Sequence, residues 1–225
     1  MKEFYIIANW KAKLNLSETA SWLNDFKKQF KQPKNKIKII LAPTATALFY
    51  VSKYCKQNSL DIEISSQDVS RFAKGAYTGE SPAEIIKDFV NYSIIGHSER
   101  RRLFNETTPI LSDKLKQCRL NNIRTIYCIE NLEDELISEA DLIAFEPKSA
   151  IGTGNNLEPE KLHQIKKTHN QIKKPFLYGG SISLENIEGY FKIKGLVDGF
   201  LISSASKDPI KFLSAIDLID KALDK

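Results

Sequence analysis

Eight short apolar runs recur along the chain, with helical patterns between them. They cover residues 4–8, 37–42, 61–65, 92–95, 125–129, 142–145, 175–178 and 196–202. Most are apolar at nearly every position, which is typical of parallel strands that are buried on both faces. Eight alternations of strand and helix predict an α/β fold, a single (β/α)8 barrel formed by residues 1–225. The segment between the fifth and sixth strands is shortened and has room for little more than a short helix.

The intervening segments carry signals for where helices begin. Aromatic residues recur every four positions in residues 17–30, which predicts a helix with Ser17 as its N-cap. Ser81 is followed by a proline and, at the third position beyond it, by a glutamate, a capping-box pattern that predicts a helix over residues 83–89. Residues 206–209 are expected to open the last helix.

The charge and the cysteine content of the chain limit which binding partners and which cellular compartment are expected. The net charge of +5 is spread along the chain, so a nucleic-acid partner is not expected, whereas an anionic substrate is favoured. Cys55, Cys118 and Cys128 lack metal-ligand spacing and are interpreted as reduced thiols of a cytoplasmic protein. The N-terminal segment does not resemble a signal peptide and no apolar run reaches membrane-spanning length, so no membrane partner is expected.

Four of the predicted strands end in residues that can support chemistry. Asn9 and Lys11 follow the first strand, His97 the fourth, Glu146 the sixth, and Gly179-Gly180-Ser181 the seventh. The ends of parallel barrel strands converge on one face, so an acid, an imidazole, an ammonium group and Gly/Ser anion donors would share one pocket. A proline and a segment with two glycines follow Glu146, which is the composition of a lid that closes over an anion.

Each of these residues also has a purely structural interpretation. Lys11 could be a solvated charge, His97 a buried structural histidine, Glu146 a helix cap or an arginine partner, and Gly-Gly-Ser an ordinary turn. Their joint placement at strand ends favours the shared pocket. His163 and His169 fall on a predicted surface helix, and for these two the structural interpretation is preferred.

Five motifs, in this order along the chain, resemble those of the triosephosphate isomerases. They are Asn9-Trp10-Lys11, GAYTGE at 75–80, IGHSERR at 95–101, Glu146-Pro147 with AIGTG at 150–154, and YGGS at 178–181. The resemblance implies a TIM barrel and an aldose–ketose isomerase that interconverts dihydroxyacetone phosphate and D-glyceraldehyde 3-phosphate. It further implies proton transfer through an enediol(ate), a place in glycolysis and gluconeogenesis, no cofactor and no metal.

The resemblance also implies a role for each site residue. Glu146 would be the base, and His97 a neutral electrophile whose pKa is lowered by a helix that Ser98 caps. Asn9 and Lys11 would contact the substrate carbonyl. The phosphate would be bound by the N–H groups of Gly152, Ser181, Ser203 and Ser204. Glu99 would be a supporting residue of the site.

The resemblance also implies a homodimer, because in the family a long loop after the third strand inserts into the neighbouring subunit. Here that loop covers residues 67–80. Phe72 and Tyr77 are too apolar for a solvated loop tip and require a surface to bury against. By the same resemblance, Thr78 is the residue expected to cross over and reach the active site of the partner subunit.

The chain departs from the family's pattern at several positions. Ser203-Ser204 replaces a Gly-Gly pair, Lys148-Ser149 and Asn155-Asn156 alter both ends of the lid, and Asn105 replaces a glycine that Asn can mimic at positive φ. The chain is also shorter than the roughly 250 residues typical of the barrel.

Two other functions stay open: another phosphate-binding barrel enzyme such as an aldolase, or a barrel that binds phosphometabolites or partner proteins without turnover. A Schiff-base aldolase would need a lysine late on the sixth strand, where Glu146 stands.

Overall fold

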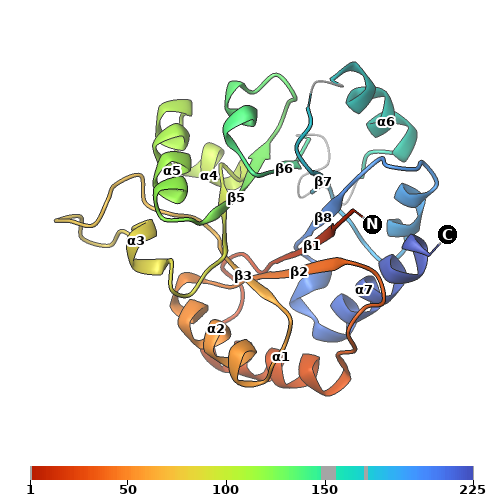
Figure 1. The fold of residues 1–225 in the computed structure, drawn as a ribbon, viewed down its shortest axis with the longest axis horizontal. Coiled ribbons are helices and arrows are strands. Elements are labelled where there is room, and N and C mark those ends of the chain that lie inside the picture. Colours follow the sequence, from red (N-terminus) through yellow and green to blue (C-terminus); the bar gives the residue numbers. More distant parts are fainter. Residues whose placement is uncertain (1, 148–155, 170–171, 225) are drawn as a thin grey trace.

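Eight parallel strands close into a barrel in which each strand pairs with the next along the chain and β8 pairs with β1 (Figure 1). The structure is a computed structural model and describes residues 2–147, 156–169 and 172–224. The strands are β1 (Phe4–Asn9), β2 (Ile37–Ala42), β3 (Glu63–Ser66), β4 (Tyr92–Ile95), β5 (Arg124–Ile129), β6 (Leu142–Phe145), β7 (Phe176–Tyr178) and β8 (Gly199–Ile202). The predicted (β/α)8 barrel is confirmed.

The predicted strand bounds differ from the structure mainly at β3 and β8. β3 starts at Glu63, and β8 starts at Gly199, later than the first apolar residue of each predicted run. Gly195 has a φ of +71°, so the chain is still turning there. The register pairs Gly199 with both Tyr5 of β1 and Leu177 of β7, and this is where the chain joins the sheet.

Helices surround the barrel on its outer side (Figure 1). The α-helices are α1 (Leu16–Gln29), α2 (Leu48–Gln57), α3 (Ala83–Ile86), α4 (Ser98–Leu103), α5 (Thr108–Leu120), α6 (Pro159–Thr168) and α7 (Pro209–Leu223). Within the described residues, four 3₁₀ helices lie between them: η1 (Ala45–Ala47), η2 (Glu135–Glu139), η3 (Ile187–Phe191) and η4 (Ala205–Lys207). Between β5 and β6, a segment that the structure describes in full, the chain forms no helix other than the short η2, which confirms the predicted shortening of this segment.

Two of the predicted helix caps are wrong, although α3 begins at Ala83 as predicted. α1 is capped by Asn15 and not by Ser17: the Asn15 side chain accepts from the Glu18 N–H at 2.9 Å, and the Glu18 carboxylate accepts from the Asn15 N–H at 2.8 Å. The capping box at Ser81 does not form, and α3 ends at Ile86. Ser81 instead accepts the Ser70 N–H through its carbonyl at 3.0 Å, which draws it into the preceding loop.

The last helix begins within the predicted residues 206–209. α7 is capped by Asp208, which accepts the N–H groups of Ile210 and Lys211, and the preceding residues form η4. His163 lies on the exposed face of α6, as expected. Asn105 has a φ of +53°, which agrees with its place in the position of a glycine.

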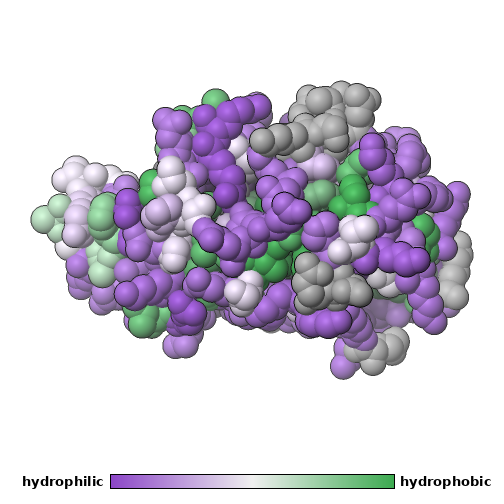
Figure 2. All heavy atoms as spheres, turned by 90° about the horizontal axis from the view of Figure 1, so that it is seen from above, coloured by the Kyte–Doolittle hydropathy of each residue, from purple (hydrophilic) through white to green (hydrophobic). Residues whose placement is uncertain are grey.

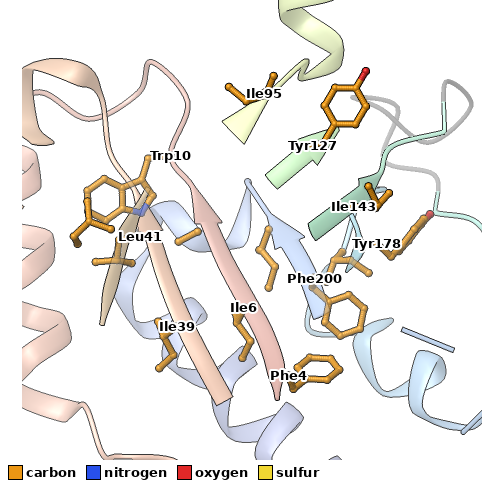
Figure 3. Packing of buried hydrophobic residues seen from close by; sticks show 14 of the residues in the cluster. Phe4, Ile6, Trp10, Ile39, Leu41, Ile95, Tyr127, Ile143, Tyr178 and Phe200 are labelled. Atoms are coloured by element: carbon orange, nitrogen blue, oxygen red, sulfur yellow. The ribbon is translucent and has the colours of Figure 1, made fainter. Parts of the chain in front are cut away.

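The hydrophobic core has two layers separated by the sheet. Tyr5 and Ile7 of β1 point into the barrel, whereas Phe4 and Ile6 point outward against the helices. Figure 3 shows Ile6 beside Ile39 of β2 in this outer layer. Because side chains alternate along a strand, the inward and outward sets follow directly from sequence position.

The three cysteines and the helices were used above to predict where the protein resides, and the structure describes both. Cys55, Cys118 and Cys128 are all buried free thiols. Burial raises the pKa of Cys55 and of Cys118 to about 12, so neither is a reactive thiolate at neutral pH. In the part of the chain that the structure describes, no helix has the length and apolar character needed to cross a membrane.

Candidate active site

Strand alternation brings the predicted acid and the predicted amide to the mouth of the barrel. Ile7 of β1 and Ala144 of β6 point into the barrel. Asn9 and Glu146 come two residues later on the same strands' paths, so they share the inward direction. Each has only 4% of its surface exposed. Burying a carboxylate this deeply is costly unless partners compensate, so the surroundings of Glu146 decide its state.

A cavity of about 320 Å³ opens at this end of the barrel. It is lined by Asn9, Lys11, His97, Glu146, Gly179, Ser181, Ile182, Ser183, Asn186, Leu201, Ser203 and Ser204. The structure therefore brings together the predicted residues of four strand ends and of the loop after β8. Gly152 lies outside the described residues.

Cavity volume alone does not identify this site. A larger hollow of about 530 Å³ lies at the opposite end of the strands, around Glu3, Lys38 and Arg124. It contains none of the predicted site residues, and its acidic and basic side chains are mixed. We therefore assign the active site from the chemistry of the lining residues.

Glu146 and His97 contact each other directly. The Glu146 Oε1 atom lies 3.1 Å from His97 Nε2, and its Oε2 atom accepts the Ser98 N–H at 3.2 Å. The Glu99 N–H donates to His97 Nδ1 at 3.2 Å, which requires an unprotonated Nδ1. The imidazole proton therefore resides on Nε2 and faces the Glu146 carboxylate.

The two side chains shift each other's pKa. Burial lowers the pKa of His97, but the charge and hydrogen bond of Glu146 outweigh it, so the pKa of His97 is raised above its ordinary 6.5. Burial raises the pKa of Glu146, but His97 and the Ser98 N–H outweigh it, so the pKa of Glu146 is lowered. The sequence predicted a lowered pKa for His97. The structure gives the opposite direction because the buried carboxylate of Glu146 is in direct contact with the ring. Its effect on the pKa of His97 exceeds the lowering expected from the helix.

The helix beside His97 starts one residue earlier than predicted. His97 itself is the N-cap of α4, through the bond from the Glu99 N–H to its Nδ1 atom. Ser98, the predicted cap, is the first residue of the helix. Its Oγ atom is buried without a hydrogen-bond partner among the described residues. Ser98 contacts Glu146 through its backbone N–H.

Lys11 is held in place by three neighbours. Its Nζ atom pairs with Glu99 Oε1 at 2.8 Å, and its N–H donates to Asn9 Oδ1 at 3.0 Å. Its φ of +52° is unusual for a residue with a side chain. The Gln67 Nε2 group donates to the carbonyls of Lys11 and Ala42, each at 2.8 Å. Gln67 was missed by sequence reasoning, although its place directly after the third strand could have indicated it.

Backbone conformation at three further residues that line the cavity, Gly179, Ser203 and Ser204, suits the residue types found there. A Cβ atom on Gly179 would lie 3.0 Å from Glu146 Cγ, so this glycine leaves room for the acid. Neither Ser203 nor Ser204 has a positive φ, and Ser204 has a φ of −63°. Replacing the family's Gly-Gly pair by serines therefore costs no backbone strain here.

The three residues predicted for a subunit contact lie apart from this cavity. The loop between β3 and α3 extends away from the barrel in Figure 1. Phe72 and Tyr77 are 38% and 45% exposed, and their rings stack at 4.3 Å. Thr78 is exposed beside them. Figure 2 shows pale green and white, hydrophobic and neutral, residues gathered at the left end of the molecule, where this loop lies.

Known proteins match nearly the whole chain. The model of the triosephosphate isomerase family matches residues 4–141 and 132–219. A protein named triosephosphate isomerase from Mesomycoplasma hyorhinis is 34% identical over 245 aligned positions, which cover 97% of this chain and 99% of the relative. One of the same name from Thermodesulfovibrio yellowstonii is 35% identical, with 96% of this chain and 99% of the relative covered. The barrel, the buried Glu146–His97 pair and these matches agree: the chain belongs to the triosephosphate isomerase family.

Proposed function

We propose that Glu146 is the base with which this chain interconverts dihydroxyacetone phosphate and D-glyceraldehyde 3-phosphate, the reaction of its family. The observation that carries the assignment is the buried carboxylate of Glu146, 3.1 Å from His97 Nε2 and in one cavity with Lys11 and Asn9. The lowered pKa of Glu146 keeps it ionised at neutral pH, as a base must be. Its contact with His97 is the resting arrangement that the substrate replaces.

The reaction moves a proton between adjacent carbons of the substrate. Glu146 takes the proton from the carbon beside the carbonyl, and the electron pair of that C–H bond forms the carbon–carbon double bond of the enediolate. The carbonyl oxygen gains negative charge and accepts hydrogen bonds from the Nε2–H of His97 and the ammonium group of Lys11. Glu146 then returns the proton to the neighbouring carbon, while a hydroxyl proton moves between the two oxygens.

His97 acts as a neutral donor in this scheme. Its Nδ1 atom accepts the Glu99 N–H, so the ring has one proton, and that proton faces the substrate from Nε2. The ion pair of Lys11 with Glu99 fixes the ammonium group at the mouth of the barrel. Asn9 orients Lys11 through the bond to its N–H.

The substrate phosphate is proposed to bind at the other end of the cavity. Ser181, Ser203 and Ser204 line the cavity, and backbone N–H groups of loops are good phosphate ligands. Gly152 of the lid is proposed to add a further N–H group. Phosphate binding there would place the reacting carbons between Glu146 and His97.

We further propose that residues 1–225 form one domain and that the protein is a cytoplasmic homodimer. The pairing of β1 with β8 supports the single domain. The exposed, stacked rings of Phe72 and Tyr77 support the dimer, because apolar rings on a projecting loop gain stability by burial against a partner. Three unpaired, buried cysteines support the cytoplasm.

A coupled assay with the purified protein tests the function. D-glyceraldehyde 3-phosphate is supplied together with glycerol-3-phosphate dehydrogenase and NADH, so NADH is consumed only when dihydroxyacetone phosphate forms. We expect consumption that depends on the protein and disappears in the Glu146→Gln variant. Cleavage of a ketose bisphosphate without isomerisation would instead support an aldolase. Phosphate binding without any turnover would support a non-catalytic barrel.

A further inference from the structure

The segment after β7 contains a side-chain clamp that the reaction scheme does not use. Asn186 donates from Nδ2 to the Ser181 carbonyl at 2.9 Å and accepts the Ser183 N–H on Oδ1, also at 2.9 Å. Both polar atoms of its amide are therefore bonded to the backbone of the same loop. One side chain closes the loop from Ser181 to Asn186.

The clamped residue has an unusual backbone conformation. Ser181 has a φ of +52°, in the left-handed region that residues with a side chain rarely adopt. Such a conformation persists where the surroundings hold it, and such residues concentrate at binding sites. The carbonyl that Asn186 holds belongs to Ser181 itself, so the bond acts directly on the strained residue.

The clamp is anchored on a rigid part of the fold. Asn186 directly precedes η3, where Ile187 is fully buried and Tyr190 is 1% exposed. Ile182, inside the clamped loop, is 6% exposed. The amide of Asn186 thus connects a packed element to the loop that lines the phosphate end of the cavity.

We propose that Asn186 is a positioning residue for phosphate binding: it holds Ser181 in the left-handed conformation and so fixes the loop that receives the phosphate. The inference rests on the proposed role of Ser181 in binding phosphate. Asn186 acts through Ser181 and has no part in the proton transfer. Its loss is expected to weaken binding and to leave the chemical step largely intact.

The test compares Asn186→Ala with a matched asparagine elsewhere. Asn58 also donates from Nδ2 to a backbone carbonyl, that of Tyr54 at 2.8 Å, and accepts a hydrogen bond from Lys27 on Oδ1. It caps the end of α2 and does not line the cavity. Three quantities are measured for each variant: KM and kcat for dihydroxyacetone phosphate, the dissociation constant of inorganic phosphate by calorimetry, and Tm.

We expect Asn186→Ala to raise KM and the phosphate dissociation constant by about 3- to 10-fold, the effect of losing one or two hydrogen bonds, with kcat within about twofold. Asn58→Ala is expected to leave both binding quantities unchanged. A fall in Tm with unchanged phosphate affinity would show a purely structural role and overturn the inference. Phosphate affinity is measured without turnover, so a protein that binds phosphate but lacks isomerase activity would contradict the proposed function alone.

A double-mutant cycle tests the strain directly. Glycine adopts a positive φ without cost, so a Ser181→Gly variant no longer needs the clamp. In that background Asn186→Ala is expected to change the phosphate dissociation constant by less than about twofold. Equal effects of Asn186→Ala in the two backgrounds would contradict the role assigned to the Ser181 conformation.

Discussion

At the scale of single residues, the candidate site depends on one buried carboxylate–imidazole contact. Glu146 and His97 are the acid and the imidazole that the sequence placed at two strand ends, and they meet at 3.1 Å. The sequence could predict that both residues share one pocket, because parallel barrel strands end on one face, but it did not predict their direct contact. It could not predict which atom caps α4, since His97 and Ser98 are adjacent and both side chains can accept a hydrogen bond.

Contacts from loop side chains to backbone groups were not predictable. Gln67 and Asn186 each hold a residue with positive φ, Lys11 and Ser181. Such bonds follow no sequence period and depend on where two loops meet in space. By contrast, the positive φ of Asn105 could be predicted, because the family has a glycine at that position.

The pKa of His97 is expected to fall in a Glu146→Gln variant. The carboxylate that raises this pKa is removed, while burial of the ring, which lowers it, remains. NMR titration of the imidazole in both proteins measures the change. An unchanged pKa would show that Glu146 does not act on the ring.

The same pair contributes to stability over a limited pH range. The contribution of His97, with its raised pKa, is complete below about 6.5 and is lost as the pH rises through the folded-state pKa. The contribution of Glu146, with its lowered pKa, is complete above about 4.5 and is lost as the pH falls through the folded-state pKa. The wild type should therefore exceed Glu146→Gln in stability most clearly between these values.

At the scale of elements, apolar runs located all eight strands, and caps were the weaker signal. Runs buried on both faces differ from every other segment of the chain, so their positions are robust. Caps depend on one side-chain bond each, and a neighbour with equal capacity can take over, as Asn15 does at α1. The short 3₁₀ helix η2 suffices after β5 because Leu132, Leu136 and Ala140 are buried against the barrel.

Closure of the barrel between β8 and β1 requires a glycine at position 199. A Cβ atom there would clash with the Tyr5 carbonyl oxygen, which is a backbone atom and cannot easily move away. We expect Gly199→Ala to destabilise the fold by about 3 kcal/mol, which lowers Tm by roughly 6–12 °C. The control is Gly189→Ala, whose Cβ, among the residues that the structure describes, would meet only Pro159 Cγ, at an ordinary contact distance of 3.5 Å. Equal melting temperatures for the two variants would contradict the close approach of the strands.

The loop after β8 is expected to bind phosphate despite its two serines. Ser203 and Ser204 keep the negative φ that lets their N–H groups serve as glycine's would. Inorganic phosphate should therefore compete with the substrate, and restoring Gly-Gly at 203–204 should change KM while kcat stays within about twofold. Steady-state kinetics with added phosphate give both answers. If inorganic phosphate does not inhibit at high concentration, the loop after β8 is not a phosphate-binding site.

At the scale of the whole molecule, we expect the protein to be a homodimer joined through the loop between β3 and α3. A charge at an apolar contact is costly to bury, so Phe72→Glu or Tyr77→Asp should give monomers with much lower turnover. Sedimentation of the wild type and the variants measures the change. The matched control is Ile210→Glu, another exposed apolar residue, on α7. A fully active wild-type monomer at micromolar concentration would contradict the dimer.

The central claim is that Glu146 moves a substrate proton within the fold of a triosephosphate isomerase. Its most direct test is NMR of D-glyceraldehyde 3-phosphate formed from dihydroxyacetone phosphate in D₂O by the wild type and by Glu146→Gln. The wild type should give product with deuterium on the carbon that accepts the proton, because the base exchanges with solvent. Glu146→Gln should stay folded and lose activity by far more than the roughly hundredfold that a misplaced base costs. Near wild-type product formation by a folded Glu146→Gln variant would contradict the account.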